Sequence, residues 1–133
     1  MAQTVYELTT LEIKVFSNAS VYAALQQHLP EAGGDLLGVF ASDIGDLSRV
    51  LVLRAFASAD VQAEARRKLL LQKNPLGCAE WLVSMQSESY LLFPFLEPVK
   101  PGKLGKWYEF RTYHIRQGAL AETIEAWKEA VPP

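Results

Sequence analysis

The order in which strand-like and helix-like patterns follow one another is the feature that most restricts how this chain can fold. Residues 4–16 are rich in β-branched and aromatic side chains that mostly alternate with polar ones, which predicts a strand. A helical spacing follows, then two strands joined by a turn at residues 43–46, then a second helix and a fourth strand. The order β-α-β-β-α-β predicts an α+β fold with a split βαβ antiparallel sheet and helices on one face.

Apolar spacing sets the expected bounds and faces of these elements. The later strands are expected at residues 36–41, 49–56 and 86–96. The helix residues expected to point inward are Val21, Leu25 and Leu29 in the first helix and Val61, Ala65 and Leu69 in the second. The second helix is expected to be capped by Ser58 or Asp60. The strand at residues 49–56 is almost continuously apolar, which predicts the centre of the sheet and burial on both faces.

An internal repeat indicates a second, incomplete copy of the same unit. The segment VYEL that begins at Val5 realigns with WYEF, which begins at Trp107, and the alignment continues without a gap to Ile13 and Ile115. We therefore predict a complete domain over residues 1–97, a Pro/Gly/Lys-rich linker over residues 98–105, and the first strand and helix of a second repeat over residues 106–133. The strand is expected at residues 106–116.

A lone strand and helix cannot by themselves satisfy a sheet edge or bury an apolar helix stripe. The extra β-α unit could pack on its own first domain, add to the sheet of a partner chain, or belong to a longer two-domain protein. We favour a shortened or fragmentary homologue whose extra strand joins a sheet edge, with formation of a homodimer.

Composition excludes several classes of protein. The net charge of -2 gives no electrostatic footprint for nucleic acid. A single cysteine, Cys78, cannot form an intramolecular disulfide, and no two histidines have a spacing suited to a metal ion. No apolar run reaches membrane-spanning length, and the N-terminus resembles neither a secretory signal nor a mitochondrial presequence. A soluble, cytoplasmic protein that binds no metal is expected.

Several short motifs together resemble those of the NIPSNAP family. The segment YEFRTY that begins at Tyr108, followed by Gly118 and a helix carrying Trp127, is similar to the opening of NIPSNAP domains. The matching positions in the first copy are Gly38, Phe40, residues 44–47, Phe56, residues 65–67 and Trp81. The similarity spans residues 4–97 and then 106–130.

The resemblance implies a ferredoxin-like fold of the dimeric α+β barrel type, in which two sheets pack face to face around a pocket. Family function is poorly defined, and related barrels include antibiotic-biosynthesis-type monooxygenases and haem-degrading enzymes. This chain carries Ser48, Val52 and Arg54 where the family tends to have Asn, His and Trp, so chemistry that needs the histidine is not expected. No flavin, nicotinamide or haem motif is visible, and no cofactor is expected.

Five residues form the candidate ligand site. Glu109, Arg111 and Tyr113 alternate along the expected strand and therefore share one face, and Glu7 occupies the matching face in the first copy. A guanidinium beside a carboxylate and an aromatic ring could orient an acidic or carbonyl-bearing ligand. Arg54 interrupts an apolar strand, so it either lines a polar pocket or reaches solvent, with Glu7 or Glu109 as its natural partner. The alternative is a purely structural Glu–Arg pair.

Two functions follow from these patterns. The first is binding of a small organic ligand in an inter-sheet pocket, with monooxygenase-like or acid–base chemistry. The second is a non-catalytic protein–protein interaction module that uses exposed sheet edges. The sequence identifies no catalytic group, so it leaves enzymatic activity open.

Overall fold

The structure, a computed structural model, describes residues 3–131 and contains the predicted order of elements in its first part. The strands are β1 (Val5–Ile13), β2 (Asp35–Ala41), β3 (Arg49–Phe56) and β4 (Leu82–Tyr90). The helices are α1 (Asn18–His28), α2 (Ala59–Leu70) and α3 (Leu120–Ala130), with two 3-10 turns, η1 (Leu29–Glu31) and η2 (Pro75–Gly77). Within residues 3–131, every helix falls short of the length and apolar character that a bilayer-spanning segment needs.

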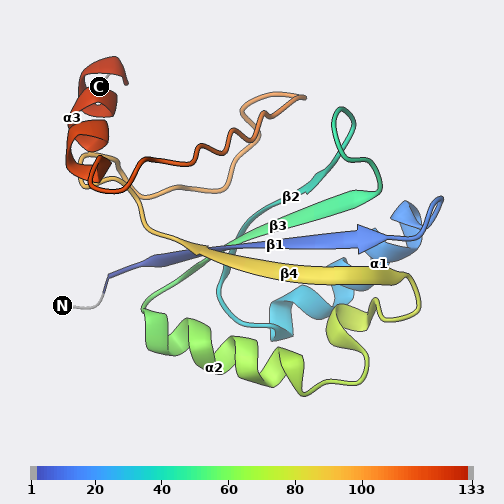
Figure 1. The fold of residues 1–133 in the computed structure, drawn as a ribbon. Helices are drawn as coiled ribbons and strands as arrows, with labels where there is room; N and C mark the ends of the chain where they lie inside the picture. The colour runs from blue at the N-terminus through green and yellow to red at the C-terminus, as the bar shows by residue number, and fades with distance from the viewer. Residues whose placement is uncertain (1–2, 132–133) are drawn as a thin grey trace. The chain divides into compact units, whose positions relative to one another are not determined.

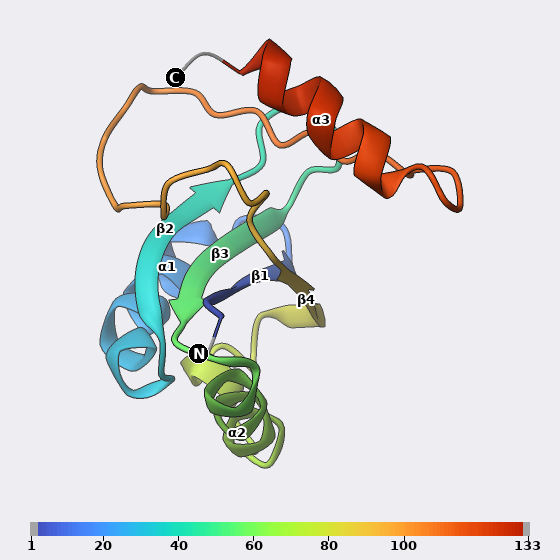
Figure 2. The same ribbon diagram turned by 90° about the vertical axis from the view of Figure 1, so that its left-hand side faces the viewer.

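The four strands form one antiparallel sheet in the order β2-β3-β1-β4 (Figures 1 and 2). The two central strands, β1 and β3, pair along almost their whole length, with Glu7 opposite Arg54 and Thr9 opposite Val52. Because β3 lies between β1 and β2, the connection through α1 crosses over its neighbour, as in a split βαβ unit. The predicted α+β fold is confirmed.

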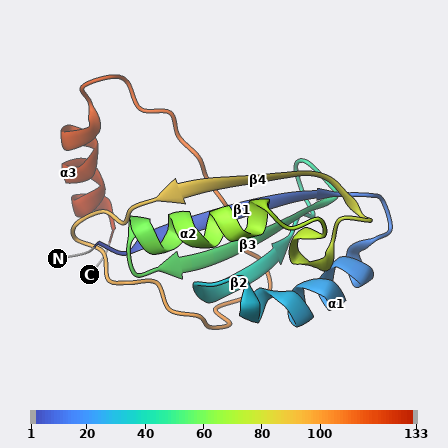
Figure 3. The ribbon, with the colours of Figure 1, turned by 90° about the horizontal axis from the view of Figure 1, so that it is seen from below.

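Helices α1 and α2 both pack on the same face of the sheet (Figure 3). Alternate residues of β1 and β3 point to that face, and the core forms where they meet the helices and η2. Its buried members are Leu11, Ile13, Val21, Leu25, Leu29, Val50, Val52, Leu69, Leu76 and Cys78. This one-sided core stabilises the sheet by about 25 cal/mol for each Å² of apolar surface that it removes from water.

The opposite face of the sheet carries the other set of alternating residues. Leu51 and Leu53 of β3 are half-buried, whereas their neighbours Val50 and Val52 are fully buried. The central position predicted for β3 is therefore confirmed, but burial on both of its faces is not. An apolar sequence alone does not show whether each face of a strand is covered, because that depends on which elements pack against it.

The fourth strand lies earlier in the chain than the sequence predicts. It was expected at residues 86–96 and runs from Leu82 to Tyr90. Its register with β1 places Leu82 opposite Ile13 and Tyr90 opposite Tyr6. β1 offers only one residue beyond Tyr6, so the ladder ends there, and the following segment contains Pro94, which has no backbone N–H to donate.

The chain divides into two compact units. The first contains the residues up to Leu91 together with Val99–Gly102, and the second contains Leu92–Pro98 and the residues from Lys103 onward. In the second unit, α3 forms as the spacing of Leu120, Ile124 and Trp127 predicts. The strand expected at residues 106–116 is not formed among the described residues. A helix satisfies its backbone hydrogen bonds internally, whereas a strand needs a neighbouring strand to do so.

The glycine that precedes β2 provides a test of how closely the turn before β2 packs on β3. Gly34 has a φ of +74°, and a Cβ there would lie 2.9 Å from the Phe56 ring and 3.1 Å from the carbonyl oxygen of Ala55. Gly45, in the β2–β3 turn, has a φ of +101° but nothing within 4 Å of its Cβ position. Urea denaturation should therefore give a loss of about 1–2 kcal/mol for Gly45→Ala, from backbone strain alone. Gly34→Ala should lose more, by a further ~1–3 kcal/mol for the overpacked ring. Equal losses for the two variants would contradict the close approach of Gly34 to Phe56 and Ala55.

Candidate functional site

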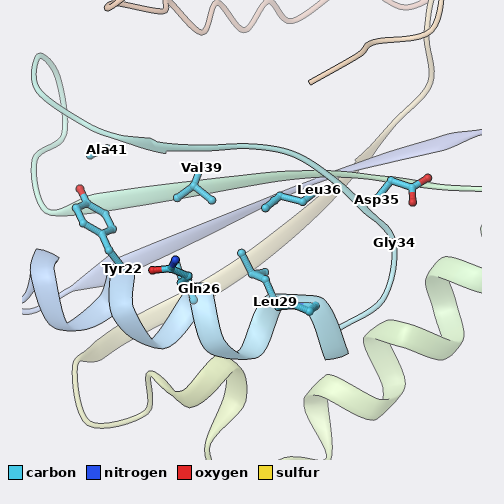
Figure 4. A pocket seen from close by; sticks show the side chains of 10 residues that line it. Tyr22, Gln26, Leu29, Gly34, Asp35, Leu36, Val39 and Ala41 are labelled. Carbon is cyan, nitrogen blue, oxygen red and sulfur yellow. The ribbon is translucent and has the colours of Figure 1, made fainter. Parts of the chain in front are cut away.

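An apolar groove lies between α1 and the edge strand β2 (Figure 4). Tyr22, Gln26 and Leu29 succeed one another on one side of the helical segment and point toward the strand, where Leu36 and Val39 form the opposite wall. Val21 and Leu25, on the adjacent helix face, are buried in the core, so α1 covers the sheet interior and leaves its side toward β2 open. The cavity measures about 810 Å³, within the usual range for small-molecule sites.

The walls of the groove are apolar side chains that remain partly open to solvent. Tyr22, Leu36 and Val39 are 39%, 45% and 38% exposed, respectively. Solvent-exposed apolar side chains facing one another across a hollow are characteristic of a binding surface, because a ligand there removes apolar area from water. Pro30 and Gly34 line the end of the groove where the helical segment turns into β2.

The groove contains few polar side chains. The amide of Gln26 points into it and makes no side-chain hydrogen bond within the described residues. The hydroxyl of Tyr22 accepts a hydrogen bond from Asn18 Nδ2 at 3.2 Å and keeps its own proton available to donate. Asp35 is the one charged residue among the lining side chains, and it lies at the end farthest from Tyr22 (Figure 4).

A buried polar network lies on the same face of the sheet, beneath α2. The carboxylate of Glu7, 1% exposed, accepts hydrogen bonds from Arg54 Nη2 at 3.0 Å and Gln62 Nε2 at 2.8 Å. Arg66 Nη2 at 3.3 Å and Thr9 Oγ1 at 3.2 Å complete its partners. A buried carboxylate is stable only when such donors replace water. These contacts join β1, β3 and α2 through a single side chain.

Arg54 links this network to the turn that precedes β2. Its Nη1 donates to the carbonyl oxygens of Ala32 and Gly33, each at 3.2 Å, and its guanidinium lies 5.2 Å from the centroid of the Phe56 ring. Burial lowers the pKa of Arg54, and the neighbouring Glu7 carboxylate opposes that shift. The Nε of Arg54 is buried and has no hydrogen-bond partner among the described residues.

The sequence-predicted site residues fall into two groups. Glu7 and Arg54 are brought together as an ion pair, as expected for Arg54. They lie beneath α2, so they are not on the helix-free face that an inter-sheet pocket would use. Glu109 and Arg111 form an exposed ion pair at 2.9 Å in the second unit, and the hydrogen bond from Arg111 lowers the pKa of Glu109. The ring of Tyr113 lies 6.2 Å from that of Trp127. Ligand binding by these five residues stays a prediction.

Sequence reasoning missed the polar residue that α2 contributes. Val61, expected to point inward, is 50% exposed, whereas its neighbour Gln62 is 6% exposed and hydrogen-bonded to Glu7 and to Ser89 Oγ. Leu69, also expected to point inward, is buried in the core, and Ala65 is partly buried. Only the first turn differs from the prediction, because there the inner face of α2 meets a buried carboxylate. The spacing of Gln62, Arg66 and Leu69 along one face of α2 was the available signal. The N-cap of α2 is Ser58, one of the two residues predicted.

Cysteine and metal chemistry find no support in the described residues. Cys78 is fully buried, and burial raises the pKa of its thiol, which disfavours the thiolate that a nucleophile requires. Residues 3–131 contain no group of three acidic, histidine or cysteine side chains placed to hold a metal ion.

The fold and sheet order define an α+β protein of the ferredoxin-like class. The NIPSNAP family model matches residues 4–96, and the chain belongs to the NIPSNAP family. A NIPSNAP family protein from Agrobacterium tumefaciens is 23% identical, with a TM-score of 0.57 over 72% of this chain and 91% of its own. An uncharacterized NIPSNAP-like protein from Burkholderia xenovorans is 21% identical, with a TM-score of 0.59 over 76% and 95%.

More distant structures share the fold alone. A candidate antibiotic biosynthesis monooxygenase from Nitrosomonas europaea is 13% identical, with a TM-score of 0.53 over 71% of this chain and 95% of its own. No curated protein matches the chain. The comparisons therefore establish family and fold, and they assign no activity or ligand.

The polar network yields a matched pair of substitutions on adjacent residues of α2. Gln62→Leu removes two hydrogen bonds from a buried network, and should lower the free energy of unfolding by about 1–3 kcal/mol. Val61→Ala alters an exposed side chain and should change it by no more than about 0.5 kcal/mol. Thermal or chemical denaturation of the two variants measures the difference. A larger loss for Val61→Ala would indicate instead that Val61 points inward, as the sequence predicts.

Proposed function

We propose that this protein binds a small, uncharged and largely apolar molecule in the groove between α1 and β2. The observation that carries the proposal is the Gln26 amide, which points into a hollow of about 810 Å³ between apolar walls and has no hydrogen-bond partner within residues 3–131. A few placed polar groups on an apolar surface are what fixes the orientation of a ligand in such sites. Membership of the NIPSNAP family is compatible with this function but does not specify it.

The polar groups of the groove favour a particular kind of ligand. The amide of Gln26 offers two donors and one acceptor, and the hydroxyl of Tyr22 offers a further donor. Together they suit a carbonyl or hydroxyl group on an apolar or aromatic body. Asp35, at the far end, would repel a carboxylate, and the lining holds no cation to compensate an anion. The ligand class is therefore a neutral compound.

The place of binding differs from the inter-sheet pocket expected from the sequence. The groove lies between a helix and an edge strand of one chain, and Glu7 and Arg54 lie beneath α2 rather than in its lining. Proton transfer through Tyr22 or Asp35 is the chemistry that the lining residues could supply. Monooxygenase-like chemistry has only the fold likeness behind it, so binding is the function we propose.

We also propose that two copies of this chain associate through the helix-free face of the sheet. Neither α1 nor α2 covers that face, which bears Leu8, Leu51 and Leu53. Half-buried leucines in a row on two central strands support association, because pairing two such faces removes further apolar area from water. The interface would lie on the opposite side of the sheet from the groove.

A protein partner is the second candidate function, favoured by one observation. Among the described residues, β2 is an edge strand with β3 as its neighbour, and Leu36 in the groove wall is 45% exposed. A peptide that adds a strand to β2 would gain affinity from main-chain hydrogen bonds. Such a partner would cover the groove rather than enter it.

Filling the groove tests the proposed binding site. Val39→Trp places an indole between α1 and β2 and should abolish fluorescence enhancement of Nile red, an uncharged apolar dye, at concentrations that saturate the native protein. Val83→Trp, on the other edge strand, is the matched control, because Val83 is 61% exposed and outside the groove. Dye binding that persists in Val39→Trp, or that native protein lacks, would contradict the proposed site.

Association through the helix-free face has its own test. Size-exclusion chromatography with light scattering should give the mass of a dimer for native protein at high micromolar concentration. Leu53→Glu, which puts a charge on that face, should give a monomer, because an unpaired charge in an apolar interface is strongly unfavourable. Leu70→Glu, on an exposed position of α2, should remain dimeric. A native protein that stays monomeric throughout would refute the proposed association.

A further inference from the structure

The turn that connects η1 to β2 determines how the two walls of the groove meet. Leu29 and Pro30 on one side of this turn and Gly34 on the other all line the groove. Ala32 and Gly33, between them, instead line a second, smaller hollow beside α2. A shift of this turn would therefore change the separation of the α1 wall from the β2 wall.

Few backbone interactions hold the turn in place. Gly33 and Gly34 both have positive φ values, +88° and +74°, and glycine is the residue with the greatest backbone freedom. The amide of Ala32 donates to Leu29 O at 3.0 Å, within the turn itself. The carbonyl groups of Ala32 and Gly33 receive their side-chain hydrogen bonds from Arg54. A side chain from the centre of the sheet thus fixes a turn that its own glycines leave adaptable.

Burying Arg54 carries a free-energy cost. Its side chain is 3% exposed, its Nε lacks a partner among the described residues, and burial lowers its pKa. Replacing a buried ion pair by apolar residues of similar size is often neutral or stabilising. Stability alone therefore does not account for the arginine, whereas a planar group with several fixed donors can hold two carbonyls and one carboxylate at once.

We propose that Arg54 is a positioning residue for the groove: held by Glu7, it clamps the carbonyl groups of Ala32 and Gly33 and so sets the spacing between α1 and β2. This inference rests on the proposed binding function of the groove. Arg54 does not touch the ligand. It acts through the turn, and Glu7, fixed in turn by Gln62, Arg66 and Thr9, orients its guanidinium.

The test removes both members of the ion pair together, so that no unpaired charge of the pair stays buried. In Glu7→Gln/Arg54→Met, the melting temperature should change little. Affinity for Nile red should nevertheless fall about tenfold, the factor that corresponds to the net free energy of one hydrogen bond to a charged group. Hydrogen exchange at the amides of residues 33–36 should become faster by a similar factor.

Ile13→Val is the control, because it removes one buried methyl group at the end of β1 opposite to Glu7, outside the polar network. It should lower stability and leave both the dye affinity and the exchange of residues 33–36 unchanged. If the double variant does not fold, Arg54→Lys takes its place: lysine keeps the charge beside Glu7 but lacks the planar fork that spans both carbonyls. It should show the same two losses.

Unchanged dye affinity and unchanged exchange in the double variant, or in Arg54→Lys, would overturn the clamp. This failure is distinct from failure of the proposed function. Dye binding that is insensitive to Val39→Trp would place the ligand elsewhere, while the exchange of residues 33–36 would still decide whether Arg54 fixes the turn. A loss of affinity shared by Ile13→Val would also count against the clamp, because it would show a general effect of lower stability.

Discussion

A single buried carboxylate sets the geometry of the first unit. Glu7 lies near the start of β1, a central strand of the sheet, and its buried charge must be matched by donors from other elements. Those donors are Arg54 on β3 and Gln62 and Arg66 on α2, so the network fixes where the second helix lies over the sheet. Burial of the apolar core favours packing but does not depend on orientation. The hydrogen bonds of the network do depend on it, and they determine how α2 is oriented on the sheet.

The groove forms because two helices do not fully cover one face of a four-stranded sheet. α1 buries Val21 and Leu25 against the central strands, which carry most of the core. β2, at the edge, is left facing the flank of the helix with its apolar side chains partly exposed. The polar network and the groove are thus neighbours with different roles: the first is saturated by protein donors, whereas the second holds an amide, on Gln26, without a partner among the described residues.

Local patterns predicted what depends on local interactions. The bounds of β3 and the N-cap Ser58 agree with the structure because an apolar run and a capping serine are recognised from neighbouring residues. The bounds of β4 and the absence of a strand at residues 106–116 depend on which strand offers hydrogen bonds, a non-local property. The Glu7–Arg54 pair was expected because an arginine in an apolar strand needs a partner. The groove was not, since its formation depends on where α1 lies relative to the edge strand.

We propose that the groove between α1 and β2 receives a neutral apolar molecule. The most direct measurement is a titration of isotopically labelled protein with Nile red, followed by the backbone and side-chain amide signals. Saturable shifts are expected at Gln26, including its side-chain amide, and at Leu36 and Val39, with little change on the helix-free face. Shifts confined to Leu51 and Leu53, or shifts that never saturate, would contradict it.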